Sequence, residues 1–208
     1  MEKGTFFALK SKSQDNSFRA TPLFTGNSSE EGQLVDKLAE GKFDCFEFPI
    51  KFVQDRGERL YDFLNTSWVG LYLISNRIRE ILLENEISGW SSYNIELYDK
   101  KGEIVPGYWG FAVHGRVGKI AYSEDTIIGK RLIPDGPLCS FYVGKFFNLN
   151  SWDSSEIFLS ANSRAIFCTS KVVNLLIASK CTHVYFEDIT TIQVAKSNVE
   201  FYNKNLSA

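Results

Sequence analysis

Only two histidines occur in the sequence, so few residues are available for acid–base chemistry near neutral pH. His114 lies in a glycine-spaced stretch that also contains Tyr108 and Arg116. If these three side chains converge, they predict a small-ligand site in which His114 acts as a general base or contacts the ligand. Strand alternation instead places His114 on the opposite face from Phe111 and Val113. That position is typical of a solvated strand residue, and this simpler interpretation is favoured.

His183 follows a helical pattern at the point where a strand begins, and it is predicted to be a turn residue. Neither histidine has an HxxxH spacing or a neighbouring cysteine pair, which argues against a zinc site. We therefore expect no metal and no cofactor.

Signatures of nucleophilic catalysis and phosphate binding are missing, because the sequence has no GxSxG elbow and no P-loop. Asp153 and Glu156 lie close together in the chain. Paired carboxylates act as acid and base only when their surroundings separate the two pKa values, which the sequence does not show. We expect no catalytic residues and no enzymatic activity.

The segment from Trp152 to Glu156 joins a large aromatic side chain to two carboxylates. If Trp152 is exposed, then Trp152, Asp153, Ser155 and Glu156 predict a partner-binding site, since tryptophan is favoured at the centre of interfaces. The alternative is a turn in which Asp153 and Ser155 bond to the local backbone while Trp152 fills the core. The sequence favours the turn without excluding the binding site.

Two segments share one pattern without a gap, because residues 74–95 can be laid over residues 168–189. Each reads as a buried strand, a hydroxyl residue, a basic residue, an apolar helical stripe and a second strand. Ser75 pairs with Thr169, and both hydroxyls are predicted to cap a helix by accepting a bond from a first-turn amide. The repeat therefore predicts two duplicated strand–helix–strand units that serve as scaffold.

Hydrophobic periodicity and turn residues predict the other elements. They are a strand at 5–9, a helix from the capping box at Ser28 to Gly41, an edge strand at 46–52 that contains Pro49, strands at 68–74 and 90–98, a glycine-spaced stretch at 107–118 with bulges or close backbone approach, and a strand–turn–strand at 127–147. The predicted fold class is α+β. We expect a single domain over residues 1–208, with a mixed, mostly antiparallel sheet on which the two repeat units pack.

Composition limits the kinds of partner. The net charge is −2 and both signs are interspersed, unlike the clustered basic residues of a nucleic-acid-binding protein. The sequence shows no signal peptide, and no apolar run approaches the roughly 18 residues of a membrane helix. Four scattered cysteines without a CxxC motif predict reduced, buried thiols in a cytoplasmic protein. We expect no nucleic-acid or membrane partner.

Five sequence segments occur in a fixed order between residues 68 and 192: 72–90, 97–102, 105–108, 115–118 and 152–158. This series resembles immunity protein family eleven of bacterial polymorphic toxin systems, whereas the N-terminal third is generic. The family typically reads Trp-Asp-Gly-Ser-Asp where this chain has Ser154 and Glu156. Because Ser154 replaces the family's glycine, a tight turn at this position is in doubt. The acidic residue that ends the motif is retained as Glu156.

The resemblance implies a cytoplasmic protein that binds and neutralises a cognate toxin delivered by neighbouring cells. Such an inhibitor needs a rigid scaffold and a complementary surface that buries on the order of 1,600 Å² in total. For that surface, Asp153 and Glu156 are predicted to steer a basic partner while Trp152 anchors it. The alternative function is a small-ligand-binding module or cryptic enzyme that uses His114 and Arg116. The sequence leaves the toxin and the oligomeric state open.

Overall fold

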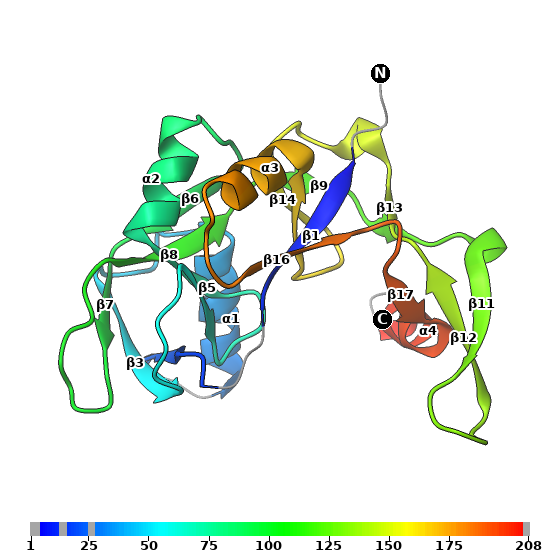
Figure 1. Ribbon diagram of the computed structural model, residues 1–208, viewed down its shortest axis with the longest axis horizontal. Helices are drawn as coiled ribbons and strands as arrows, with labels where there is room; N and C mark the ends of the chain where they lie inside the picture. The colour runs from blue at the N-terminus through cyan, green and yellow to red at the C-terminus, as the bar shows by residue number, and fades with distance from the viewer. Residues whose placement is uncertain (1–4, 13–15, 25–27, 206–208) are drawn as a thin grey trace.

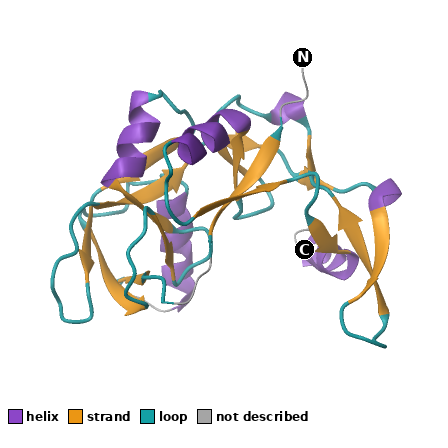
Figure 2. Cartoon of the chain, in the orientation of Figure 1, coloured by secondary structure: helices purple, strands orange, loops and turns teal. Residues whose placement is uncertain are grey.

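The computed structural model describes residues 5–12, 16–24 and 28–205. Figure 1 shows an elongated molecule in which two larger sheets lie next to each other and a smaller strand-and-helix lobe forms one end. The helices among the described residues are α1 (Ser28–Ala39), α2 (Asn76–Glu84), α3 (Ser170–Ala178) and α4 (Lys196–Asn205), with one-turn helices η1 (Glu124–Thr126) and η2 (Leu149–Ser151). Figure 2 shows that strands form most of the framework on which these helices lie.

The largest sheet has seven strands. In spatial order they are β6 (Trp90–Tyr93), β8 (Tyr108–Val113), β5 (Tyr72–Ser75), β4 (Phe63–Thr66), β2 (Arg19–Pro22), β3 (Ile50–Arg56) and β7 (Ile95–Tyr98). Neighbours are antiparallel, except that β2 runs parallel to β4 and β3 parallel to β7. Only Asn94 separates β6 from β7, although they are the first and last strands of the sheet. The sheet therefore curls until its two ends meet, as in a barrel.

Helix α1 packs against the curled sheet and closes a core with it. Val35 and Leu38 are fully buried among sheet residues such as Phe52 and Leu73. Glu30 and Glu31 lie in the first turn of α1, where carboxylates favour the positive end of the helix dipole. The predicted helix is confirmed, although capping by the Ser28 side chain lies outside the described residues.

The second sheet has five strands, in the order β16 (Val184–Asp188), β1 (Phe6–Ser11), β15 (Ile166–Thr169), β14 (Ile157–Ser160) and β9 (Arg116–Val117). Two smaller sheets pair β10 (Ile120–Ala121) with β13 (Phe146–Phe147), and place β12 (Leu138–Val143) between β11 (Ile127–Arg131) and β17 (Gln193–Ala195). The predicted strand–turn–strand is confirmed as the β11–β12 hairpin.

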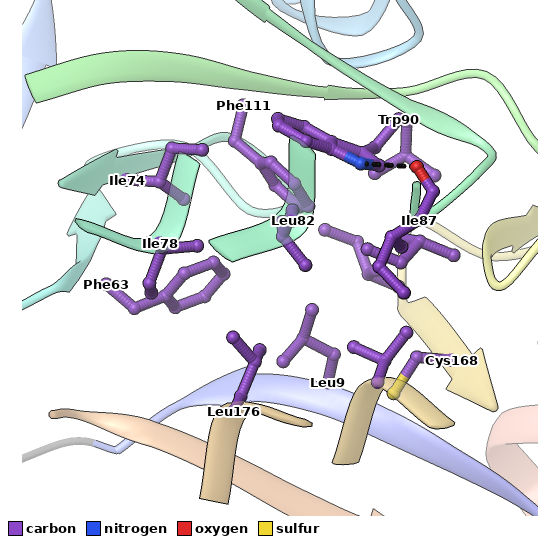
Figure 3. Close-up of a cluster of buried hydrophobic side chains, with 14 of the residues drawn as sticks. Leu9, Phe63, Ile74, Ile78, Leu82, Ile87, Trp90, Phe111, Cys168 and Leu176 are labelled. Atoms are coloured by element: carbon purple, nitrogen blue, oxygen red, sulfur yellow. Dashed lines mark hydrogen bonds between the residues drawn. The ribbon is translucent and has the colours of Figure 1, made fainter. Parts of the chain in front are cut away.

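A shared core joins the two larger sheets (Figure 3). From α2 it receives Ile78 and Leu82, and from α3 it receives Val172 and Leu176, all 3 % exposed or less. Burial of each such side chain stabilises the fold by roughly 1.5–3 kcal/mol. The apolar stripes of both helices, spaced as the sequence predicted, therefore hold the sheets together.

The two repeat segments have the same order of elements. Strand β5 leads into α2 and then β6, with β8 between the two strands, while β15 leads into α3 and then β16, with β1 between them. Both helices are followed by a residue with left-handed backbone, Glu86 after α2 and Lys180 after α3. That the segments arose by duplication stays a prediction.

The two predicted helix caps differ. Ser75 Oγ accepts a hydrogen bond from the Ile78 amide at 3.3 Å, as expected. Thr169 takes the same place before α3 but makes no capping bond, and its buried hydroxyl has no partner among the described residues. The capping prediction is therefore wrong at Thr169.

Two strand predictions also need correction. The strand expected at 90–98 is interrupted at Asn94, where the chain passes from one end of the curled sheet to the other. The strand expected at 68–74 begins only at Tyr72, because Gly70 adopts a left-handed turn conformation.

Pro49 is not part of an edge strand, which corrects a third prediction. The strand β3 begins at the following residue, Ile50, and lies between β2 and β7. Proline has no amide to donate, and Phe48 leaves the strand alternation to pack against Phe43 and Phe46. The coarser prediction, a mixed α+β fold, is confirmed.

Candidate partner-binding surface

Trp152 is half-buried in the loop that connects η2 to β14. Its ring lies edge-on to Phe6, with centroids 5.1 Å apart, and 5.8 Å from the ring of Phe158. The indole Nε1 donates to the carbonyl of Ser155 at 3.1 Å. These contacts are those of a side chain that fills the edge of a core. A role of Trp152 as a partner anchor stays a prediction.

Asp153 follows Trp152 in the same loop and makes three hydrogen bonds that hold the loop in place. Its Oδ1 accepts bonds from the Ser155 amide at 3.0 Å and from the Ser155 hydroxyl at 2.5 Å, and its Oδ2 accepts from the Arg116 amide at 2.7 Å. Burial by itself would raise the pKa of Asp153, but these hydrogen bonds outweigh it and hold the pKa below its usual range. These hydrogen bonds of Asp153 have the pattern of a local turn, which is the interpretation of this segment that the sequence favoured.

Glu156 ties the loop to both repeat units. Its Oε2 accepts from the amide of Ser88 at 2.7 Å and from the Ser88 hydroxyl, and its Oε1 pairs with Lys171 Nζ at 3.0 Å. Burial opposes ionisation, but the Ser88 bonds and the Lys171 charge lower the pKa of Glu156 to about 2. Glu156 therefore carries its charge at neutral pH next to the end of α2.

Two glycines allow this loop to approach the backbone. A Cβ on Gly115 would lie 2.2 Å from both Ser155 Oγ and the Ile157 carbonyl, and a Cβ on Gly89 would lie 2.0 Å from that carbonyl. Ser155 itself is buried. The close backbone approach predicted for the glycine-spaced stretch is confirmed at Gly115.

Ser154 has a left-handed backbone, with φ at 67°. This is the position at which the sequence left a tight turn in doubt, and the turn is present with serine. Because this conformation costs an L-residue roughly 1–2 kcal/mol, Ser154→Gly is expected to raise the free energy of unfolding by about 1 kcal/mol. Urea denaturation measures the change. Ser154→Ala, which keeps a Cβ, is the control and should give no gain; equal effects of the two variants would contradict the explanation.

The structure does not bring Tyr108, His114 and Arg116 to one site. Tyr108 begins β8 and His114 follows its last residue, Val113, so the two lie about 20 Å apart at the usual rise of a strand. Tyr108 donates to the Tyr61 carbonyl at 2.9 Å, and Arg116 donates to the Val113 carbonyl at 2.8 Å. His114 is exposed. A pocket with these three side chains converging is absent from the described residues.

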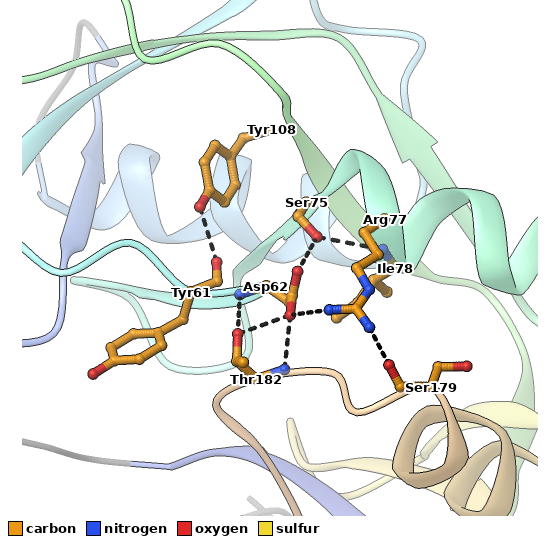
Figure 4. A network of polar contacts seen from close by, with 8 residues as sticks. All are labelled: Tyr61, Asp62, Ser75, Arg77, Ile78, Tyr108, Ser179 and Thr182. Atoms are coloured by element: carbon orange, nitrogen blue, oxygen red, sulfur yellow. Dashed lines mark hydrogen bonds and ion pairs between the residues drawn. The ribbon is translucent and has the colours of Figure 1, made fainter.

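Sequence reasoning missed a polar network centred on Asp62 (Figure 4). The carboxylate accepts from Ser75 Oγ at 2.8 Å and from the amide and hydroxyl of Thr182 at 2.7 and 2.8 Å, and it lies 3.7 Å from Arg77 Nη1. Burial would raise the pKa of Asp62, but these partners lower it. The network joins the start of α2 to the segment between α3 and β16. Its members are far apart in sequence, so no local pattern identifies them.

His183 lies beside this network and is a turn residue, as predicted, with φ at 66°. Its ring stacks on Tyr61 and bonds to the hydroxyls of Ser11 and Ser17 at 2.9 and 3.0 Å. Burial lowers the pKa of His183, which favours the neutral imidazole. All these partners are internal, as expected for a structural residue.

The outer face of α2 is acidic, and sequence reasoning did not identify it. Glu80, Glu84 and Glu86 are exposed and have no ion pair among the described residues. Leu83, between them, is 52 % exposed. The basic residues of the same helix are engaged elsewhere: Arg77 with Asp62, and Arg79 over the ring of Trp109 at 4.2 Å.

This acidic face continues into the predicted loop. Ser88, which bonds to Glu156, lies two residues after Glu86 in the connection from α2 to β6. The face and the loop therefore form one continuous strip of surface, which we call the α2–loop surface: Glu80, Leu83, Glu84, Glu86, Ser88 and Glu156.

An open groove of about 450 Å³ lies elsewhere, between α1 and the start of β3. It is lined mainly by apolar residues, among them Leu23, Phe46 and Phe48, together with Cys45.

The prediction of buried thiols is wrong for Cys45, which is exposed. It is right for Cys168, where burial raises the pKa of the thiol.

Among the described residues, no helix has the length and apolar character needed to cross a membrane. Nor do those residues contain a group of three or more His, Cys, Asp or Glu side chains placed to hold a metal ion.

Comparison with known proteins gives one positive finding. The model of the Immunity protein family (Imm11) matches residues 5–191. The match extends the predicted resemblance into the N-terminal third, which the sequence phrases alone had left generic. No curated protein matches the chain.

Proposed function

The chain belongs to the Immunity protein family (Imm11), and from this membership we propose that it binds a cognate bacterial toxin and neutralises it by protein–protein interaction. The single observation that carries the proposal is the family match over residues 5–191. The protein acts as one domain in the bacterial cytoplasm, where it covers a surface of the toxin and catalyses no reaction.

The α2–loop surface is the proposed contact with the toxin. Its carboxylates at Glu80, Glu84 and Glu86 give a basic partner a surface of opposite charge, which speeds association. Leu83 supplies an exposed apolar contact at the centre of these charges. A toxin that acts on nucleic acid has a basic cleft, and such a cleft fits this surface.

Helix stability does not explain the placement of these charges. Glu84 is the last residue of α2, where a carboxylate opposes the negative end of the helix dipole, and Glu80 lies four residues earlier with the same charge. Both arrangements destabilise a helix by a few tenths of a kcal/mol. Because these charges lower the stability of the helix, their presence supports a role in binding.

Within the loop, Asp153 and Glu156 are proposed to add to the negative potential, while Ser155 holds the loop in place. Their carboxylates are already bonded inside the protein, so we assign the larger share of steering to α2. Trp152, which is half-buried, is proposed to add an apolar contact beside these carboxylates.

The proposal is tested by co-expressing the chain with candidate toxins from its genetic neighbourhood and measuring survival and complex formation. Protection and a stable complex are expected with the cognate toxin. For the loop, Asp153→Asn combined with Glu156→Gln should slow association about twofold to threefold and reduce its salt dependence. Unfolding is measured in parallel, because both amides weaken internal bonds. Protection without any complex would contradict the binding mechanism.

A further inference from the structure

The strand β11 forms an open edge of the three-stranded sheet. It pairs with β12 on one side, and no described strand pairs with its other side. Gly129, Lys130 and Arg131 are exposed, and Ile128 is 38 % exposed. Unpaired edge strands offer free backbone donors and acceptors to another strand.

Charge along this edge changes sign from one end to the other. Glu124 and Asp125 stand immediately before β11, in η1, and Lys130 and Arg131 end the strand. Glu124 is bonded to Tyr142 and Lys196, whereas the Asp125 carboxylate has a local contact with Ser123. A strand with one acidic and one basic end is complementary to itself when reversed.

We propose that the edge of β11 binds a second copy of this chain, so that two β11 strands pair antiparallel around a two-fold axis. In a two-fold interface the same surface occurs on both sides, and each contact is made twice. Reversal of the strand then brings the acidic end of each copy beside the basic end of the other. The two small sheets join into one continuous sheet.

Pairing about Gly129 uses the whole of β11. Ile127 then lies opposite Arg131 of the other copy, and the one-turn helix η1, which carries Asp125, comes directly before Ile127. Arg131 donates to the Gly136 carbonyl of its own chain, and its guanidinium has further donors for the Asp125 carboxylate of the other copy. Gly129 meets its own copy at the axis, and its missing side chain leaves room for Leu138 of the same chain, whose Cδ2 would lie 3.1 Å from a Cβ at this position. This surface is separate from the α2–loop surface, so dimerisation does not depend on the proposed toxin contact.

Charge reversal with rescue tests the dimer. The full chain and its variants are compared by sedimentation velocity from about 10 μM to about 1 mM, a range suited to a small interface. Asp125→Lys alone and Arg131→Glu alone should each weaken dimerisation on the order of tenfold, since two symmetric contacts become repulsive. The double variant, in which the charges are exchanged, should dimerise about as well as the parent.

Two matched variants control for net charge. Asp44→Lys and Lys119→Glu change the charge by the same amounts at exposed residues outside η1 and β11, and they should leave dimerisation unchanged. Amide exchange in β11 should slow as the protein concentration rises. A parent that stays monomeric over the whole range would overturn the proposal. So would a dimer that the single reversals do not weaken, or one that the double variant fails to restore.

Discussion

Reversing charge at the end of α2, with Glu84→Lys and Glu86→Lys together, is expected to weaken toxin binding while making the free protein more stable. A lysine in the last turn of the helix would favour the helix dipole and form a favourable pair with Glu80, raising the free energy of unfolding by about 0.5–1 kcal/mol. Loss of the acidic surface should slow toxin association by on the order of tenfold or more at low salt. Stopped-flow association and urea denaturation measure the two effects.

Opposite signs make this prediction specific, because a variant that merely damages the fold loses stability and binding together. Glu58→Lys combined with Glu103→Lys is the matched control. It changes net charge equally at exposed residues outside the α2–loop surface and should slow association much less. Equal effects of the two double variants would show that overall charge, not this surface, governs association.

Removing the indole with Trp152→Ala is expected to lower the free energy of unfolding by about 3 kcal/mol. The ring packs on Phe6 and Phe158, and its Nε1 bonds to the Ser155 carbonyl, so the substitution leaves a cavity and an unpaired acceptor. Denaturant unfolding monitored by far-ultraviolet circular dichroism measures this, since the other tryptophans complicate fluorescence.

Trp152→Phe separates packing from the hydrogen bond and should lose only about 1–1.5 kcal/mol. Binding to the toxin is compared at a temperature where both variants are folded. If Trp152→Ala left stability unchanged but sped dissociation at least tenfold, the tryptophan would be a binding anchor of the kind the sequence allowed.

The capping residues show how far a local pattern can be trusted. The same sequence argument applied to Ser75 and Thr169, and both begin a helix, but only Ser75 makes the capping bond. A cap needs the hydroxyl to point at the first-turn amide, and its rotamer depends on packing. At Thr169 the side chain is buried without a partner among the described residues, so tertiary contacts decided the outcome.

Strand predictions failed where the sheet curls. The run from Trp90 to Tyr98 has the apolar content of a single strand, but Asn94 divides it between the two ends of one sheet. The pattern of side chains along the sequence identifies extended backbone. It does not identify the strands that pair with it, because these come from distant segments of the chain. For the same reason the Asp62 network could not be foreseen, since its donors at Ser75 and Thr182 belong to different repeat units.

The sequence by itself determined the helices α1, α2 and α3, the repeated order of strand, helix and strand, the β11–β12 hairpin and the family resemblance, whereas α4 was not predicted. These features depend on side-chain periodicity and turn residues that act over a few positions. Only the tertiary structure decided which charges are free. It bonded Asp153 and Glu156 to the protein itself and left the carboxylates of α2 without an ion pair among the described residues. Whether a charge is available to a partner depends on what folding places beside it, and for Glu156 those neighbours, Ser88 and Lys171, lie 68 and 15 residues away in the sequence.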